Sequence, residues 1–172
     1  MKKLLLVIDM QNDFVDGVLG TAEAVSIVPL VRKKLNEYKS LGYPIIFSRD
    51  THDTQYLNTQ EGGLLPVVHC VRGTSGHSIV SELNTEGCTV VDKGTFGCIN
   101  LAERVAELAI DCDSIEICGI CTDICVVSNA LILKAKLPEM PISVDSKCCA
   151  GSSVENHNAA LTTMKCCQIN VI

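Results

Sequence analysis

Short, uninterrupted apolar runs alternate along the chain with segments whose apolar residues recur every three or four positions. The runs have strand length and are found at Leu4–Ile8, Pro44–Phe47, Cys88–Val91, Ser114–Cys118, Ile142–Val144 and Gln168–Ile172. Strands that are apolar throughout, rather than at every second position, are typical of parallel sheets covered on both faces. The pattern therefore predicts a six-stranded, mainly parallel sheet.

The segments between these runs have the period of amphipathic helices. One extends from Ile27 to Tyr38, with Pro29 in its expected first turn and Gly42 just after its end. Three others carry the apolar sets Leu101, Val105 and Leu108; Ile124, Val127 and Leu131; and Ala160, Leu161 and Met164. Alternating strands and helices with right-handed crossovers predict a three-layer, doubly wound α/β domain. We expect residues 1–172 to form one such domain.

Composition and charge exclude several classes of protein. Apolar residues make up 47% of the chain and charged residues 20%, which is ordinary for a globular protein and unlike a disordered one. The net charge is −6, and no basic run is longer than Arg32-Lys33-Lys34. A nucleic-acid-binding surface or a polybasic membrane anchor is therefore not expected. No apolar stretch approaches the roughly 20 residues that span a bilayer.

The N-terminus and the cysteines bear on the cellular compartment. The apolar run after Met1–Lys3 ends at Asp9 and no small-residue cleavage site follows, which favours a buried strand over a signal peptide. Eleven cysteines would suggest a disulfide framework in a small secreted protein. Without a signal peptide we expect a cytoplasmic protein with mostly reduced thiols, most of which serve packing.

Residues whose side chains could take part in catalysis or metal binding follow the predicted strands. Because ligands of doubly wound folds bind beyond the carboxyl ends of the strands, these positions are the candidates for a site. They are Asp9 after the first run, Arg49, Asp50 and His52 after the second, Lys93 after the third, and the segment 119–125, which ends in Cys125, after the fourth. An acid, a cluster of metal-ligand type, a base and a thiol thus meet at one edge of the sheet.

Cys125 is expected in the first turn of a helix, with Thr122 or Asp123 as its cap. The helix dipole and a neighbouring lysine would favour its thiolate, and a carboxylate such as Asp9 could accept the thiol proton. Each residue also has a structural alternative. Cys125 could be a packed apolar residue, Asp9 a strand-end cap or salt-bridge partner, and Lys93 a solvated lysine. Only their convergence points to catalysis.

The second candidate constellation consists of Asp50, His52 and His69. Asp-x-His together with a distant histidine can supply three ligands to a divalent metal and leave positions open for water or substrate. The alternative is a structural aspartate with two solvated histidines. The segment 51–77 that holds both histidines is rich in Gly, Thr and Gln, and loops of this length are usually functional or disordered.

Five stretches in order along the chain carry a family signature. They are LLLVIDMQNDFVDG, IIFSRDTH, LPVVHCVRGTSG, VDKGTFG and EICGICTDICVVSNA. Together they resemble the isochorismatase-like cysteine hydrolases, and within them the nicotinamidases. The stretches are spread over nearly the whole chain, and the DMQNDF and G-x-C-T-D-x-C-V pieces are highly specific in combination.

The resemblance implies an amide hydrolase whose catalytic triad is Asp9, Lys93 and Cys125. It also implies a cis peptide bond between Ile120 and Cys121, which turns the N–H of Cys121 toward that of Cys125 to form an oxyanion hole. In the implied mechanism, Asp9 takes the thiol proton, Lys93 stabilises the resulting charges, and the thiolate forms a thioester that water hydrolyses.

A metal site and a substrate follow from the same resemblance. The ligands would be Asp50, His52 and His69, with zinc as the expected ion, and the metal would orient a pyridine nitrogen. Phe14 would lie against the ring. The leading activity is hydrolysis of nicotinamide to nicotinic acid in NAD salvage. The sequence departs from nicotinamidases at Thr51 and Leu65, where tryptophans are usual, and it contains no Trp.

Other functions remain open at this stage. The same triad could act on a carbamoyl or ureido compound, which needs no pyridine-binding metal. Isochorismatase activity cleaves a vinyl ether without a thiol, so Cys125 argues against it. A non-catalytic, thiol-rich redox or metal-binding protein would use Cys121 and Cys125 as a pair. A dinucleotide-binding domain is disfavoured because no G-x-G-x-x-G follows the first strand. We further expect a homo-oligomer that acts on a small molecule and binds neither nucleic acid nor membrane.

Overall fold

A six-stranded, entirely parallel sheet forms the centre of the computed structural model, which describes residues 1–172. The strand order is β3-β2-β1-β4-β5-β6. The strands are β1 (Lys3–Ile8), β2 (Ile45–Asp50), β3 (Thr89–Lys93), β4 (Ser114–Ile120), β5 (Ile142–Ala150) and β6 (Asn170–Val171). The predicted α/β class and all six strands are confirmed.

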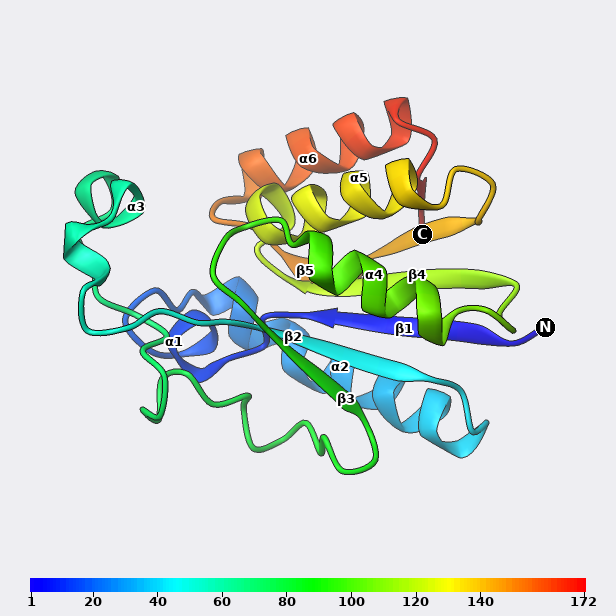
Figure 1. Ribbon diagram of the computed structural model, residues 1–172, viewed down its shortest axis with the longest axis horizontal. Coiled ribbons are helices and arrows are strands. Elements are labelled where there is room, and N and C mark those ends of the chain that lie inside the picture. Colours follow the sequence, from blue (N-terminus) through cyan, green and yellow to red (C-terminus); the bar gives the residue numbers. More distant parts are fainter.

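Helices cover both faces of this sheet. The helices on the faces are α2 (Ala22–Ser40), α4 (Ile99–Leu108), α5 (Val127–Lys136) and α6 (Val154–Cys166). The short helices α1 (Asn12–Val15) and α3 (Gln60–Leu64) lie beyond the carboxyl ends of the strands. Figure 1 shows α2 on one face and the row α4, α5 and α6 on the other. The central strand β1 is sealed between these layers, because Leu4–Ile8 are all fully buried. The three-layer, doubly wound arrangement is therefore the one that the apolar runs predict.

Helix α2 begins earlier than its periodicity suggested. It starts at Ala22, where the side chain of Thr21 accepts a hydrogen bond from the N–H of Ala24 and caps the first turn. Pro29 consequently lies inside the helix rather than in its first turn. Pro29 lies on the exposed side of the helix, as does Val25, whose carbonyl would otherwise accept a hydrogen bond from residue 29.

Several strands extend beyond their apolar runs. The runs ended at Phe47, Cys118 and Val144, whereas β2, β4 and β5 continue to Asp50, Ile120 and Ala150. Polar residues take part in the ladder at these ends, and Asp50 pairs directly with Lys93. The backbones of both residues are therefore held by strand pairing. They lie at the carboxyl edge of the sheet, which faces α1 and α3 in Figure 1.

The state of the cysteines and the character of the helices can both be compared with the expectations from the sequence. None of the eleven cysteines is in a disulfide, and only Cys166 and Cys167 are exposed. Most of the others pack in or against the apolar core, as expected. No helix combines the length and the apolar character that crossing a bilayer requires.

Candidate active site

Cys125 lies where β4 passes into the helical segment that follows it. The peptide bond between Ile120 and Cys121 is cis, at the position that the resemblance implies. A π-helical turn, Thr122–Val126, then leads into α5. The N–H of Cys121 donates no hydrogen bond to the rest of the chain, so it is free to bind an external acceptor next to Cys125.

The predicted cap of this turn is wrong. The N-cap residue is Cys121 instead of Thr122 or Asp123, and no side chain forms a capping hydrogen bond. Instead, Thr122 Oγ1 and His157 Nδ1 are hydrogen-bonded at 2.8 Å. The Asp123 carboxylate accepts hydrogen bonds from the N–H and the hydroxyl of Ser152, at 2.8 Å and 2.5 Å. Thr122 therefore ties the turn to α6, and Asp123 ties it to the β5–α6 connection.

Asp9, Lys93 and Cys125 meet behind this turn. Lys93 Nζ lies 2.7 Å from Asp9 Oδ2 and donates to Cys125 Sγ at 3.4 Å. Asp9 Oδ1 accepts a 2.6 Å hydrogen bond from the hydroxyl of Ser48. Asp9 Oδ2, in contrast, is paired by charge with Lys93 but has no well-directed donor. It is thus a buried carboxylate oxygen with room to accept a proton.

Burial sets the protonation of these groups. It raises the pKa of the Asp9 carboxyl, against the opposing charge of Lys93. It also raises the pKa of the Cys125 thiol well above its usual value, and the charge of Asp9 adds to the effect. Burial would lower the pKa of Lys93, but the charges of Asp9, Cys125 and Asp50 raise it instead. Burial of the thiol therefore opposes the stabilisation of a thiolate that the helix start and Lys93 were expected to give.

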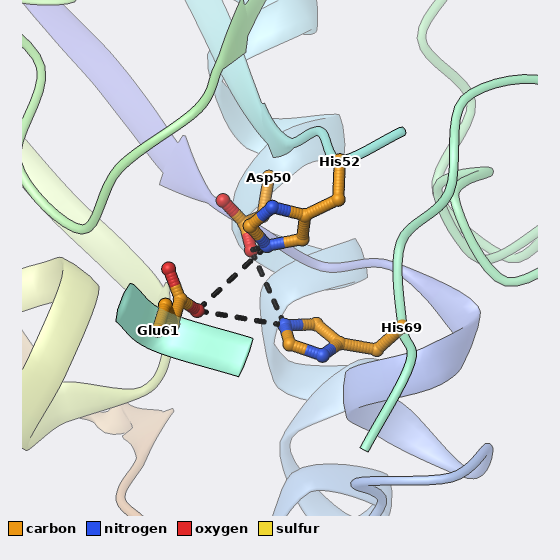
Figure 2. Close-up of side chains that lie close together, drawn as sticks. All are labelled: Asp50, His52, Glu61 and His69. Atoms are coloured by element: carbon orange, nitrogen blue, oxygen red, sulfur yellow. Dashed lines mark hydrogen bonds and ion pairs between the residues drawn. The ribbon is translucent and has the colours of Figure 1, made fainter. Parts of the chain in front are cut away.

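A second cluster lies beside the triad. Asp50, His52, Glu61 and His69 each offer one donor atom, and these four atoms all lie within 4.8 Å of one another. Figure 2 shows the four side chains pointing toward one centre. Two imidazole nitrogens and two carboxylate oxygens are donors that suit zinc and similar divalent ions. The residues present therefore fit a divalent metal.

Glu61 is the member of this cluster that the sequence analysis missed. Its Oε1 lies 3.7 Å from His52 Nε2 and 3.9 Å from His69 Nε2. The residue belongs to α3, which Figure 1 shows as a short helix at the margin of the molecule. No fixed spacing marks Glu61 as a ligand. The only sequence signal that could have indicated it is the presence of an acidic residue between two candidate histidine ligands in the same long segment.

Hydrogen bonds prepare the cluster for a cation. His69 Nδ1 lies 2.7 Å from the carbonyl of Val67, which leaves Nε2 directed at the cluster. Burial would raise the pKa of Asp50, but hydrogen bonds from His52 and His69 and the charge of Lys93 lower it well below its usual range. Asp50 is therefore an ionised, buried carboxylate.

An aromatic side chain supports both histidines. The ring of Tyr56 lies 4.6 Å from that of His52 and 4.9 Å from that of His69, measured between centroids. Tyr56 is fully buried, and its hydroxyl donates to the carbonyl of Leu65. It thus provides apolar contact to both histidines in a chain that contains no tryptophan.

Asp50 joins the two clusters. Its Oδ1 accepts a hydrogen bond from Lys93 Nζ at 3.3 Å, while its Oδ2 lies 2.9 Å from His52 Nε2 and 3.6 Å from His69 Nε2. The triad and the metal cluster are therefore neighbouring parts of one site.

A cavity of about 310 Å³ opens over this site. Its lining includes both Cys121 and Cys125 and three of the four cluster residues, Asp50, Glu61 and His69. Apolar residues form most of the remaining wall, among them Phe14, Leu19, Phe96 and Ile124, and no lysine or arginine lines the cavity. Phe14 lies with its ring centroid 5.4 Å from that of His69.

Comparisons with known proteins agree with this geometry. The family model described as "Isochorismatase domain" matches residues 3–172. A nicotinamidase of Schizosaccharomyces pombe is 28% identical, and the alignment covers 98% of this chain and 91% of that protein. Among solved structures, the pyrazinamidase of Pyrococcus horikoshii in complex with zinc gives a TM-score of 0.85 at 27% identity, covering 100% of this chain and 99% of the other. A pyrazinamidase/nicotinamidase of Streptococcus mutans gives a TM-score of 0.87 at 26% identity, with 99% and 100% covered.

Proposed function

The chain belongs to the isochorismatase domain family, and on this premise we propose that it is a cysteine amidohydrolase that converts nicotinamide to nicotinic acid and ammonia. The observation that carries the proposal is the meeting of Asp9, Lys93 and Cys125 at one end of a small cavity. The matched relatives named as nicotinamidases and pyrazinamidases support the choice of an aromatic amide.

The first half of the reaction forms a thioester. Asp9 Oδ2 takes the proton of the Cys125 thiol, and the sulfur attacks the carboxamide carbon while the carbonyl electron pair moves onto oxygen. Lys93 lies beside both partners and stabilises the negative charge that moves from carboxylate to sulfur. The backbone N–H groups of Cys121 and Cys125 hold the oxyanion.

The second half releases the products. The tetrahedral intermediate collapses as the carbon–nitrogen bond breaks, and Asp9 returns its proton to the departing nitrogen, which leaves as ammonia. A water molecule then attacks the thioester while Asp9 accepts one of its protons. The carbon–sulfur bond breaks, the acid leaves, and the proton returns to Cys125.

The metal cluster serves orientation in this proposal. A zinc ion held by Asp50, His52, Glu61 and His69 would supply a Lewis-acid contact for the ring nitrogen of a pyridine amide. Phe14 and the apolar wall exclude water from the ring, and the cavity places the carboxamide against Cys125.

The cavity wall separates this substrate from the nearest rival class. Many carbamoyl and ureido compounds carry a carboxylate, whose burial requires a cationic partner. The lining contains no lysine or arginine, so no side chain of the wall would compensate the charge of an anionic substrate. A neutral aromatic amide fits this wall better.

Ammonia release from three amides tests the proposal. The zinc-loaded protein is given nicotinamide, benzamide and an N-carbamoyl amino acid at equal concentrations. We expect nicotinamide to give the highest kcat/KM, benzamide to be weaker because it lacks the ring nitrogen, and the anionic carbamoyl compound to be the poorest. A higher kcat/KM for the carbamoyl compound would overturn the substrate, and no ammonia from any amide would overturn the amidohydrolase.

A further inference from the structure

Three polar residues of the first motif are left without a role by this mechanism. Gln11, Asn12 and Asp13 lie between Asp9 and Phe14, and none of the three lines the cavity beside Cys125. Each of their side chains is hydrogen-bonded to backbone far along the chain, between residues 50 and 77. That segment carries all four members of the metal cluster.

Gln11 brackets the backbone of Asp50. Its Oε1 accepts a 2.6 Å hydrogen bond from the N–H of Asp50, and its Nε2 donates to the carbonyls of Asp50 and His77 at 2.8 Å and 2.9 Å. Gln11 is fully buried, so these bonds replace all contact with water. The backbone of the carboxylate that joins the metal cluster to Lys93 is thus held from both sides.

Asp13 acts on the two histidines. Its Oδ2 accepts a 2.7 Å hydrogen bond from the N–H of Cys70, the residue after His69. Cys70 has a left-handed backbone with φ 47°, a conformation that a non-glycine residue adopts only when its surroundings hold it. The carbonyl of Cys70 in turn accepts a hydrogen bond from the N–H of His52 at 3.0 Å. The Asp13 carboxylate therefore holds Cys70, and Cys70 links the backbone next to His69 with the backbone of His52.

The packing around Asp13 leaves it little freedom. Gly76 lies against the Asp13 carboxylate so closely that a Cβ at this glycine would be 2.0 Å from Oδ2. The N–H of Asp13 also donates to the carbonyl of Gly76 at 3.1 Å. The carboxylate is thus packed between Gly76 and the backbone N–H of Cys70.

We propose that Gln11 and Asp13 are positioning residues of the metal cluster, which hold its ligands in place without binding the ion. The inference rests on the metal site of the proposed function. Asn12 provides the matched control. Its Nδ2 donates to the carbonyl of Ser75 at 2.8 Å in an exposed hydrogen bond, and Ser75 neither ligates nor adjoins a ligand.

Zinc affinity measured by competition with a chromogenic chelator tests the proposal in the full chain. Asp13→Ala should weaken zinc binding roughly 10- to 100-fold, the usual effect of removing a group that orients metal ligands. Asp13→Asn keeps an oxygen acceptor for the N–H of Cys70 and should recover most of the affinity. Gln11→Glu sets oxygen against two carbonyls and should also weaken binding, whereas Asn12→Ala should bind zinc like the wild type.

Alkylation of Cys125 in the zinc-free proteins separates positioning from general loss of structure. Because the triad is held by strand ends, Asp13→Ala should be alkylated at the wild-type rate. Wild-type zinc affinity in both Asp13→Ala and Gln11→Glu would overturn the inference, and so would an equal loss in Asn12→Ala. A wild-type protein that binds no zinc would refute the metal site itself, whereas amide hydrolysis by Cys125 would stand or fall by its own measurement.

Discussion

The triad and the metal cluster are in contact through Asp50, a member of the cluster that is hydrogen-bonded to Lys93, but they are built from different parts of the chain. Asp9 directly follows β1, Lys93 ends β3 and Cys125 lies in the turn after β4, so three strands of one parallel sheet carry the triad. His52, Glu61 and His69 instead come from the long connection between β2 and β3. A site on the sheet edge inherits the rigidity of the sheet, whereas a site on a connection depends on contacts that reach across the chain.

The substitution Cys125→Ala should separate the functions of the two regions most clearly. Removing the nucleophile should lower kcat for nicotinamide by roughly 10⁴-fold or more, because no other group can form the thioester. Zinc affinity should stay at the wild-type value, since Cys125 belongs to the other region. The measurement is steady-state ammonia release alongside chelator competition. Turnover within tenfold of the wild type would contradict the role of Cys125.

Asp9→Asn should give the next largest effect. The substitution preserves shape but removes the oxygen that accepts the thiol proton, and general-base catalysis of this kind contributes roughly 10²- to 10⁴-fold to kcat. Asp16→Asn is the matched control, because Asp16 lies in the same segment and is exposed. A full loss of activity in Asp16→Asn, or none in Asp9→Asn, would contradict the assignment.

A pair of adjacent glycines tests the cluster side of the comparison. A Cβ at Gly62 would lie 2.2 Å from the Tyr56 carbonyl oxygen, whereas a Cβ at Gly63 would meet nothing within 4 Å. Gly62→Ala must therefore displace α3 and the Glu61 carboxylate, and we expect roughly tenfold weaker zinc binding. Gly63→Ala should bind zinc like the wild type. Equal affinities for the two variants would remove Glu61 from the ligand set.

The smallest effect is expected where the cavity wall meets the nucleophile's turn. Asn129 is buried, donates to the carbonyls of Phe96 and Cys125 at 2.9 Å and 2.7 Å, and accepts from the N–H of Cys98 at 3.0 Å. Asn129→Ala should raise KM about threefold to tenfold by loosening the wall that carries Phe96, because each hydrogen bond contributes about 1 kcal/mol. Zinc affinity should not change. A wild-type KM would show that Asn129 is only a packing residue.

The same contrast explains what could be predicted from the sequence. Strand-length apolar runs identified all six strands, and the rule that parallel strands end at one edge brought Asp9, Lys93 and Cys125 together before any coordinates. The run nevertheless ended β2 too early, because the polar residues Ser48, Arg49 and Asp50 are held by backbone pairing with β3, which hydropathy does not register.

The connection between β2 and β3 was less predictable for a physical reason. Glu61 reaches the cluster only because α3 packs tightly on Tyr56 and Leu57 through Gly62, a contact with no periodic signature. The burial of Cys125 was also hard to foresee, because it depends on the whole fold. This burial raises the pKa of the thiol, against the local effects expected of the helix start and of Lys93.

The central claim is that Cys125 becomes covalently acylated during amide hydrolysis. It is tested most directly by mixing the zinc-loaded enzyme with nicotinamide, quenching in acid within a single turnover and examining the intact protein and its peptides by mass spectrometry. Our account predicts a mass increase equal to one nicotinoyl group, carried by the peptide that contains Cys125 and absent from Cys125→Ala. Ammonia release with an acyl group on another residue, or with undiminished turnover in Cys125→Ala, would contradict it.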